Sequence, residues 1–528
     1  MTPALLVASL LLAAGTGPED PGAAALQADP NGPSCELSGQ VLQAYGIGTP
    51  WADLARMAED VGAAPLRPDL FQRPGDRAIA VCAEGPRIPM GRQVAAPPQD
   101  TLVLDLVPAT LGVYANSAYP SGANDGALWQ GKGFSAQLGV GLQFQWGILS
   151  AAFVPGVAWQ QNAAFQILPT GQTGNLAYSN PYFGSALDVP QRFGDANFWT
   201  VTPGQSYVQL AYAGIGVGVS TENLWWGPGI RNTLLMSNNA DGFPHAYLGT
   251  VRPVDIWIGN LEASFWFGRL GRSDYFYTQD HAWFGAFTAD LELRWVRGLY
   301  LGAVAVNLSS QLSGGGDERS SNTLLGLYGR WVFPPAGVEV YGEWTREDGW
   351  VSVFDLAKEL DHSAGYTLGL QKVFLGSDYW VRLIAEITDN NIPRPSRDWR
   401  ANPVEYYVHG GNTNYTHGGQ ILGSAIGPGA SNQYLGVDVL TPSGWYGGWF
   451  ERTRRNDTHF MTQTSEFEPD VEIGGGLRYL RSFGPFDLGA VAGLAHREGY
   501  DGLPPAWNAH AEVQLTWWPG KPLVASGP

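Results

Sequence analysis

Charge is scarce in this chain of 528 residues, and its balance is acidic. Only 15% of the residues are charged, and 48 Asp and Glu outnumber 30 Lys and Arg, which gives a formal net charge of −18. Binding to a phosphate backbone needs a basic face, so we expect no nucleic-acid partner. Beyond the extreme N-terminus the chain also lacks the roughly 18 consecutive apolar residues of a membrane-spanning helix. The other structure that satisfies every backbone group in lipid is a closed β-barrel.

Glycine, proline and aromatic residues are abundant instead. The chain contains 70 Gly and 37 Pro, and 12% of its residues are Phe, Trp or Tyr. This composition suits strands joined by turns, where aromatic residues are favoured and Lys and Glu are not. It argues against a long helical protein.

The N-terminus predicts export. Residues 4–14 form an apolar run of signal-peptide length, and Ala23–Ala25 could end a cleavable segment, so residues 1–25 are expected to be a signal peptide. The cell outer membrane is the predicted destination. Two cysteines follow, Cys35 and Cys82. In an oxidising periplasm such a pair is expected to form a disulfide, and two buried thiols are the alternative.

A small helical unit is predicted between the cysteines. Thr49 and Pro50 suit an N-cap and the first helical position, and Gly62 suits the end of the helix. The residues on the apolar stripe are Trp51, Leu54, Met57, Ala58 and Val61. Pro-rich segments follow up to residue 98, so residues 26–100 are interpreted as a periplasmic helical unit with a Pro-rich linker.

From about residue 101 to residue 518 the apolar residues recur with a period of two. In 134–146 every second residue is apolar and the others are small or polar, which is one complete membrane-length strand. Counting such segments predicts an all-β fold, a large transmembrane antiparallel β-barrel of about 16 to 18 strands. A soluble β-sandwich or propeller also alternates, but its strands are usually shorter. Residues 519–528 are read as a C-terminal tail.

The connections differ greatly in length. Tight turns such as 296–298 and 333–337 are typical of the periplasmic rim of a barrel, whereas 160–205, 222–253 and 389–432 suit extracellular loops. Loops of this length are uncommon unless they are functional.

The long loops carry a family resemblance. Residues 221–229 read Thr-Glu-Asn-Leu-Trp-Trp-Gly-Pro-Gly, followed by Leu-Leu-Met-Ser-Asn-Asn-Ala at 234–240 and Phe-Pro-His at 243–245. Val-Pro-Gln-Arg-Phe-Gly at 189–194 and Tyr-Thr-His-Gly-Gly at 415–419 fit the same pattern. Together these segments resemble the capsule assembly Wzi family. The resemblance implies an outer-membrane lectin-like barrel of about eighteen strands that binds capsular or extracellular polysaccharide and helps to assemble or anchor the capsule.

The same resemblance implies loops folded over the outer mouth, a helical unit at the periplasmic end, and a lumen closed at both ends. Its expected partners are polysaccharide and outer-membrane lipid, and a monomer is expected. The chain departs from the family pattern at 429–431, where Gly-Ala-Ser replaces an expected Asp-Ser pair, so a sugar contact by that acid is not carried over.

Candidate sugar-binding residues lie in these loop segments. Trp rings stack on the apolar faces of sugars, and amide side chains offer the paired donors and acceptors that hydroxyl groups need. A Trp pair after a strand is equally typical of an interfacial girdle or of a loop that folds into the barrel. The candidates are Asn223, Trp225, Trp226, Asn232, Asn238, Asn239, His245, Tyr415 and His417.

No catalytic or cofactor site is predicted. The histidines match no common metal spacing, so neither a metal nor another cofactor is expected. Glu343, Glu347 and Asp348 imitate a glycosidase pair, but acids near a rim are usually solvated, and we expect no enzyme. The alternative function is a porin or transport channel for small solutes, for which a polar lumen would suffice.

Overall fold

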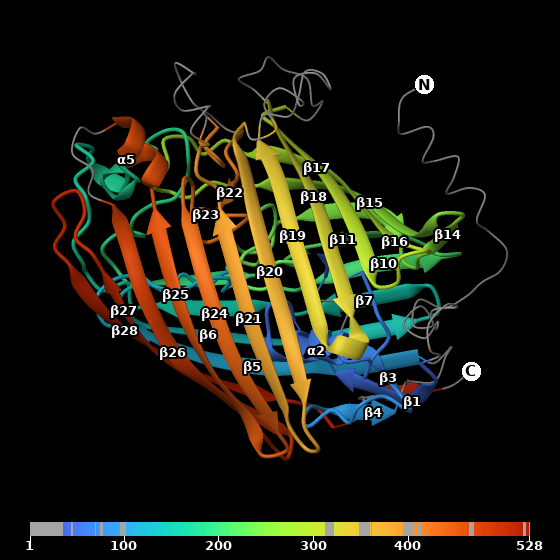
Figure 1. The fold of residues 1–528 in the computed structure, drawn as a ribbon. Helices are drawn as coiled ribbons and strands as arrows, with labels where there is room; N and C mark the ends of the chain where they lie inside the picture. The colour runs from blue at the N-terminus through green and yellow to red at the C-terminus, as the bar shows by residue number, and fades with distance from the viewer. Residues whose placement is uncertain are drawn as a thin grey trace.

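The computed structural model shows a closed antiparallel barrel with a small unit inside it (Figure 1). The structure describes residues 35–43, 46–68, 70–73, 78–95, 102–311, 321–347, 360, 362–393, 405–409, 413–463, 469–520 and 524–526. The predicted signal peptide at 1–25 lies outside them. Neither α-helix of this described part is long and apolar enough to cross a membrane.

One sheet of 22 strands forms the wall, and β28 pairs with β5 to close it. Its first half contains β5 (Leu102–Asn116), β6 (Gly133–Trp146), β7 (Leu149–Phe153), β8 (Gly156–Gln160), β9 (Phe198–Thr202), β10 (Tyr207–Tyr212), β11 (Ile215–Ser220), β13 (His245–Thr250), β14 (Val254–Ile256), β15 (Gly259–Leu270) and β16 (Ala282–Leu293). Its second half contains β17 (Leu299–Ser309), β18 (Ser321–Phe333), β19 (Val338–Glu347), β20 (Ala364–Leu375), β21 (Trp380–Asp389), β24 (Ser431–Thr441), β25 (Gly444–Arg455), β26 (Asp470–Phe483), β27 (Phe486–Arg497), β28 (Ala506–Trp517) and β29 (Val524–Ser526).

Four of these strands continue a neighbour across a break, so the wall is crossed by 18 strands. The breaks lie between β7 and β8, β9 and β10, β13 and β14, and β28 and β29. The predicted tail therefore contributes β29, which pairs with the start of β5. The structure confirms the predicted class of fold and the upper end of the predicted strand number.

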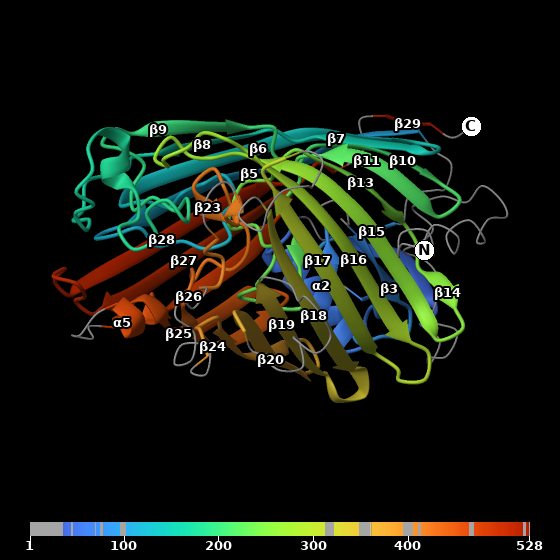
Figure 2. The same ribbon diagram turned by 90° about the horizontal axis from the view of Figure 1, so that it is seen from above.

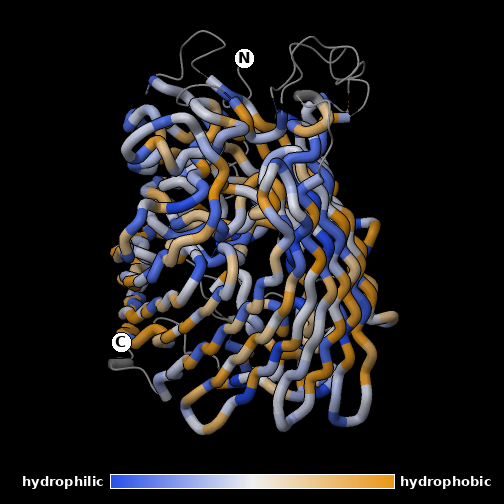
Figure 3. Tube along the Cα trace, turned by 90° about the vertical axis from the view of Figure 1, so that its left-hand side faces the viewer, coloured by the Kyte–Doolittle hydropathy of each residue, from blue (hydrophilic) through white to orange (hydrophobic). Residues whose placement is uncertain are grey.

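The alternating pattern determines which face of the wall is apolar. In β6, Phe134, Leu138 and Trp146 are exposed on the outside together with the other even-numbered residues, and the odd-numbered residues face the lumen. Figure 3 shows the same mixture of apolar and polar residues along the strands. Since the outer face is apolar and no sheet edge is left at the closure, this is the architecture of a transmembrane β-barrel.

The N-terminal unit lies inside the barrel (Figure 2). Its helix α2 (Pro50–Asp60) begins as predicted: the Thr49 hydroxyl accepts a hydrogen bond from the Ala52 amide, and Pro50 occupies the first turn. Beside it lie a three-stranded sheet of β1 (Leu37–Gln43), β3 (Ala78–Cys82) and β4 (Gln93–Ala95), and the short strand β2 (Phe71–Gln72). The sequence indicated the helix but not these strands, because segments of two to seven residues carry little periodicity.

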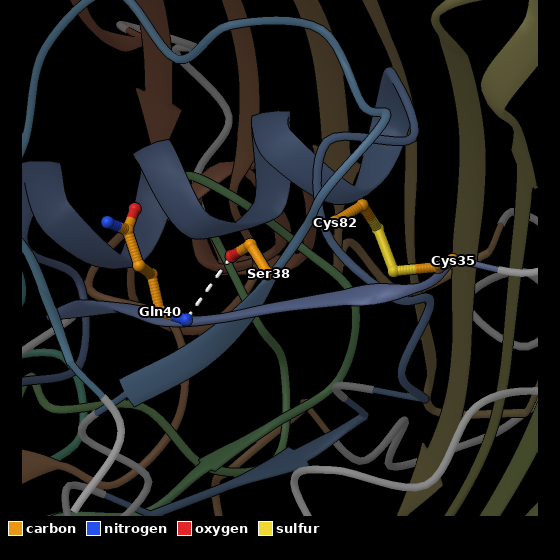
Figure 4. Close-up of a disulfide and its surroundings, with 4 residues drawn as sticks. All are labelled: Cys35, Ser38, Gln40 and Cys82. Carbon is orange, nitrogen blue, oxygen red and sulfur yellow. Dashed lines mark hydrogen bonds between the residues drawn. A yellow bond between two sulfur atoms is a disulfide. The ribbon is translucent and has the colours of Figure 1, made fainter.

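A disulfide joins Cys35 to Cys82, the pair for which we predicted one. It links the start of the unit to the end of β3, close to the Ser38 hydroxyl in β1 that accepts a hydrogen bond from the Gln40 amide (Figure 4).

Buried ion pairs join this unit to the wall. Arg56 of α2 donates to Glu339 of β19, and Arg330 of β18 bridges Glu339 and Glu59 of α2. All four side chains are buried. Residues 61–66 of the unit also contact the short turns after β16 and β18, so the unit lies at the rim that carries the short turns. By the usual asymmetry of such barrels this is the periplasmic rim, and the long loops lie at the outer mouth.

We expect Glu339→Gln to loosen the unit from the wall. The substitution leaves Arg56 and Arg330 buried beside a neutral partner, which should cost about 3–5 kcal/mol. Thermal unfolding in detergent and limited proteolysis of the N-terminal unit measure the effect. The control is Arg87→Ala, which removes an exposed ion pair with Asp378 and should change little. Equal melting of wild type and Glu339→Gln would contradict the expectation.

Candidate functional site

Residues 221–244 leave the wall after β11 and fold into the lumen before β13 begins. Within them Trp225–Trp226 forms β12, which pairs with β2 of the N-terminal unit. Trp226 is fully buried between Phe71 and Trp266, with ring centroids 6.2 and 5.7 Å away. This segment, hereafter the inward loop, therefore joins the wall to the unit.

Two lumen carboxylates hold the inward loop by its backbone. Glu343 of β19 accepts hydrogen bonds from the amides of Gly229 and Leu234, both at 2.9 Å. Glu386 of β21 accepts from the amides of 230–232 at 2.7–3.2 Å. Both carboxylates are buried, so each gives a partner to groups that would otherwise be unsatisfied.

The prediction that the acids near this rim are solvated is wrong for two of them. Glu343 and Glu347 are 2% and 0% exposed, and Glu347 accepts from the Asn322 amide group at 2.9 Å. The inward loop and the outer segments cover them, which a strand pattern does not reveal. Asp348 lies outside the described residues.

Above the N-terminal unit the lumen contains a cavity of 1110 Å³. Its wall is the inner face of β24–β28 together with β5, β6 and β8; its floor is the start of α2. Residues 165–168, 180–183 and 500–504 of the outer loops line its upper part. It extends from the outer mouth to the unit that lies at the periplasmic rim.

Trp449 of β25 forms an aromatic platform in this wall. Trp449 stands opposite Gly476 in register, and Gly476 stands opposite Gly493. A Cβ atom on Gly476 would lie 2.4 Å from the Trp449 ring, and one on Gly493 would lie 3.5 Å from it. The two glycines therefore let the ring lie close to the sheet, half-buried beside the cavity.

Arginines and acids alternate around the platform. Arg231 forms a two-bonded pair with Glu451, at 3.0 and 2.9 Å, and Arg478 pairs in the same way with Asp438. Further towards the mouth Arg455 pairs with Glu472 and Arg497 with Asp470. These cations are thus neutralised by the protein itself.

Two further carboxyl groups, Asp125 and Glu512, line the cavity without a salt bridge in the part of the chain that the structure describes. Burial, followed by the charge of Glu512, raises the pKa of Asp125 to about 8. At neutral pH Asp125 is therefore protonated and can donate a hydrogen bond. No cluster of three or more metal-binding side chains occurs within the described ranges.

Five of the nine predicted site residues line this cavity: Asn223, Trp225, Asn232, Asn238 and Asn239. Most of their polar atoms are already used. Asn223 donates to Ala240 and Asn239 to Ile421, while the Trp225 indole donates to Gly229. The Oδ1 atom of Asn238 is buried without a partner. The side chains of these residues mainly stabilise the inward loop, and they also line the cavity.

Of the other four predicted residues, three lie in the packed interior and His417 is half-buried. Trp226, His245 and Tyr415 are 0%, 4% and 0% exposed, and Tyr415 stacks on Tyr407 with centroids 5.9 Å apart. His417 accepts a hydrogen bond from the Gly271 amide, and burial, helped by Arg272, lowers its pKa to about 4. None of the four lines the cavity. Their side chains pack or form hydrogen bonds within the protein, which is the alternative that the sequence left open.

Sequence reasoning missed the platform and the charges around it. One signal was available: the three consecutive glycines 474–476 follow a strand with a central tryptophan. Aromatic side chains commonly cover glycines on a neighbouring strand. No sequence pattern indicates that Asp125 lines the cavity, because only the closure of the barrel brings it near Glu512.

We expect Glu343→Ala to destabilise the inward loop. It leaves the Gly229 and Leu234 amides buried without acceptors, at a cost of about 2–4 kcal/mol. The melting temperature should fall and proteolysis within 221–244 should appear, whereas Asp255→Ala, on an exposed pair, should behave as wild type. Unchanged melting of Glu343→Ala would refute the anchoring role.

The raised pKa of Asp125 predicts that the free energy of unfolding depends on pH. An unfolded Asp releases its proton near pH 4, whereas the folded chain keeps it to about pH 8. Stability is therefore lost as pH rises between these values. Asp125→Asn should raise the unfolding free energy near pH 8 by about 1–2 kcal/mol, allowing for screening by cavity water, with no gain near pH 4. Thermal melts across this range test it; a constant difference between the two chains would contradict it.

Comparisons with known proteins agree with this architecture. A search of solved structures finds Escherichia coli Wzi, described as an outer-membrane carbohydrate-binding β-barrel involved in group 1 capsule assembly. The two share 13% identity, with 78% of this chain and 85% of that chain covered and a TM-score of 0.55, so the likeness is one of fold. Weaker similarities reach OccAB2 of Acinetobacter baumannii (8% identity, 79% and 98% covered, TM-score 0.42) and a BenF-like porin of Pseudomonas fluorescens (10%, 80% and 98%, 0.41).

A sequence comparison with curated proteins finds no match. Residues 109–330, from β5 to β18, match the family described as capsule assembly protein Wzi. This stretch includes the whole inward loop and the outer loop before it. The fold is that of an outer-membrane β-barrel, and residues 109–330 of the chain are similar to the capsule assembly protein Wzi family.

Proposed function

We propose that the chain binds a capsular or extracellular polysaccharide of its own cell at the outer mouth and helps to anchor it there, without enzymatic activity. The observation that carries the proposal is the cavity with its Trp449 platform, which lies below the outer loops and above the N-terminal unit.

The chemistry of the cavity suits a sugar chain. One face of a pyranose ring is apolar and stacks on an aromatic ring, and its hydroxyl groups need donors and acceptors side by side. Trp449 supplies the ring, while Gln137, Gln514 and the Asp125 carboxyl group line the same space. A cavity of 1110 Å³ has room for a short segment of a chain.

The N-terminal unit below the cavity favours binding over passage. Arg56 donates both to Glu339 of the wall and, at 2.6 Å, to the Pro228 carbonyl of the inward loop. The N-terminal unit is thus tied to the wall and to the loop by buried contacts, so it stays in the lumen beneath the cavity. This weakens the alternative of a porin for small solutes.

The family adds independent support. Proteins of this family are named for capsule assembly, and the solved Escherichia coli Wzi is described as carbohydrate-binding. A role outside catalysis is consistent with the use of Glu343 and Glu386, because their oxygens accept from backbone amides and are not left to transfer protons.

Substitution of the platform tests the proposal. Trp449→Ala should weaken binding to polysaccharide isolated from the native organism by about two- to tenfold, since the stacking of an aromatic ring is worth about 0.5–1.5 kcal/mol. Trp449→Tyr should retain most of the affinity because it keeps a ring. Trp507→Ala is the matched control, since Trp507 is 62% exposed on the lipid-facing side of β28.

Binding is measured by retention of the polysaccharide on immobilised protein, and the fold by heat-dependent mobility on a gel. Equal binding by wild type and Trp449→Ala would exclude the platform. Large, stable pores in planar bilayers, together with no retention of polysaccharide by wild type, would replace the proposal by the porin alternative.

A further inference from the structure

The lipid-facing wall is interrupted where the inward loop leaves it. β11 ends at Ser220 and β13 begins at His245, and these two residues pair with each other. Above this level β9 has β8 as its single neighbour in the described sheet. The strands around the interruption, β7, β10, β11, β13 and β15, lie side by side in Figures 1 and 2. The outer half of the wall therefore has a notch above β11 and β13.

Directly below the notch an apolar trough runs across the outside of the wall. One row of outward-facing residues follows the register from strand to strand, with small or medium side chains in the middle and a phenylalanine at each side. The row is Phe144, Ala151, Val208, Val219, Ala246 and Phe267. The trough and the notch together form an open depression of about 750 Å³ on the outer face.

The hydroxyl groups at the notch are already hydrogen-bonded within the protein. The Ser206 hydroxyl donates to the Pro203 carbonyl at 2.5 Å, and the Thr221 hydroxyl donates to the Gly204 carbonyl at 2.8 Å. Because these two hydroxyl groups are satisfied inside the protein, they add little desolvation cost when an apolar ligand covers the surface. At this level the wall faces the hydrocarbon core, so the natural occupant is an acyl chain.

A cation lies at the outer end of the trough. Arg269 is the second-last residue of β15, exposed on the outer face, and its guanidinium lies 5.9 Å from the ring centre of Trp283. Trp283 in turn stacks on Phe267, with centroids 5.6 Å apart. Arg269 has no acidic partner among the described residues. An arginine near the end of a membrane-spanning strand reaches the interface, where its guanidinium can pair with the phosphate of a lipid headgroup.

We propose that the trough is a binding site for a single phosphate-bearing lipid of the outer leaflet, with one acyl chain between Phe144 and Phe267 and the phosphate against Arg269. This goes beyond polysaccharide binding and does not depend on it. The site would attach the protein to a particular lipid at the side of the barrel on which the inward loop begins.

The test uses the full chain purified in detergent, with dipalmitoyl phosphatidic acid as the phosphate-bearing probe and dipalmitoylglycerol as the phosphate-free probe. Native mass spectrometry counts the lipids that each barrel keeps. Wild type should keep a single phosphatidic acid, with an affinity about tenfold above that for the diacylglycerol.

Val219→Trp fills the trough and should abolish retention of both probes. Its control is Val437→Trp on β24, where valine is similarly exposed to lipid, 48% against 59% for Val219. Arg269→Gln should bind the two probes equally. Its control is Arg452→Gln, at the corresponding outer end of β25 and facing lipid beside Gln433, which should keep the preference for phosphate.

Several outcomes would overturn the proposal: no retained lipid on wild type, several lipids with no preference, or equal loss in Val219→Trp and Val437→Trp. Heat-dependent mobility and polysaccharide retention, measured on the same preparations, show that Val219→Trp is folded. If it is misfolded, Ala246→Leu, which narrows the trough by less, replaces it and should lower retention while Val437→Leu does not.

Discussion

The backbone amides of residues 229–234, bound by the carboxylates of Glu343 and Glu386, are the constraint on which the rest of the structure depends. A segment with irregular backbone cannot enter a barrel unless its amides find acceptors there. Glu343 of β19 and Glu386 of β21 provide these acceptors. Once the inward loop is held in this way, Trp225 and Trp226 can pair with the N-terminal unit, and Arg56 can bridge the loop and the wall.

The entry of the inward loop into the lumen creates two surfaces. Inside, the inward loop and the N-terminal unit fill part of the lumen and leave a cavity beneath the outer loops, with the Trp449 platform in its wall. Outside, the departure of the chain between Ser220 and His245 leaves the notch and the trough below it. The proposed polysaccharide site and the proposed lipid site therefore lie on opposite sides of the same loop. A change in the anchoring acids should affect both.

The charged side chains that line the cavity are largely paired within the protein. Arg231, Arg478 and Arg497 are each matched by a carboxylate on a nearby strand or loop, so the polar lumen is nearly self-neutralised. Asp125 is an exception, because it faces Glu512 rather than a cation and keeps its proton at neutral pH. A neutral carboxyl group among paired charges favours an uncharged, hydroxyl-rich ligand over an ion.

Local patterns determined much of this protein from sequence alone. Alternation with a period of two predicted the barrel, because the two faces of a transmembrane strand meet different solvents. Thr49, Pro50 and Gly62 predicted helix α2, because capping depends on neighbours in the chain. Of the candidate residues, Trp226, His245 and Tyr415 are buried and His417 is half-buried, and no sequence pattern was used to identify Trp449 beside the cavity. Whether a loop tryptophan faces a cavity or the core depends on partners such as Phe71 and Glu343, which lie more than a hundred residues away in sequence. Only the closed barrel brings those partners together, and so the tertiary structure alone decided which residues face the cavity and which face lipid.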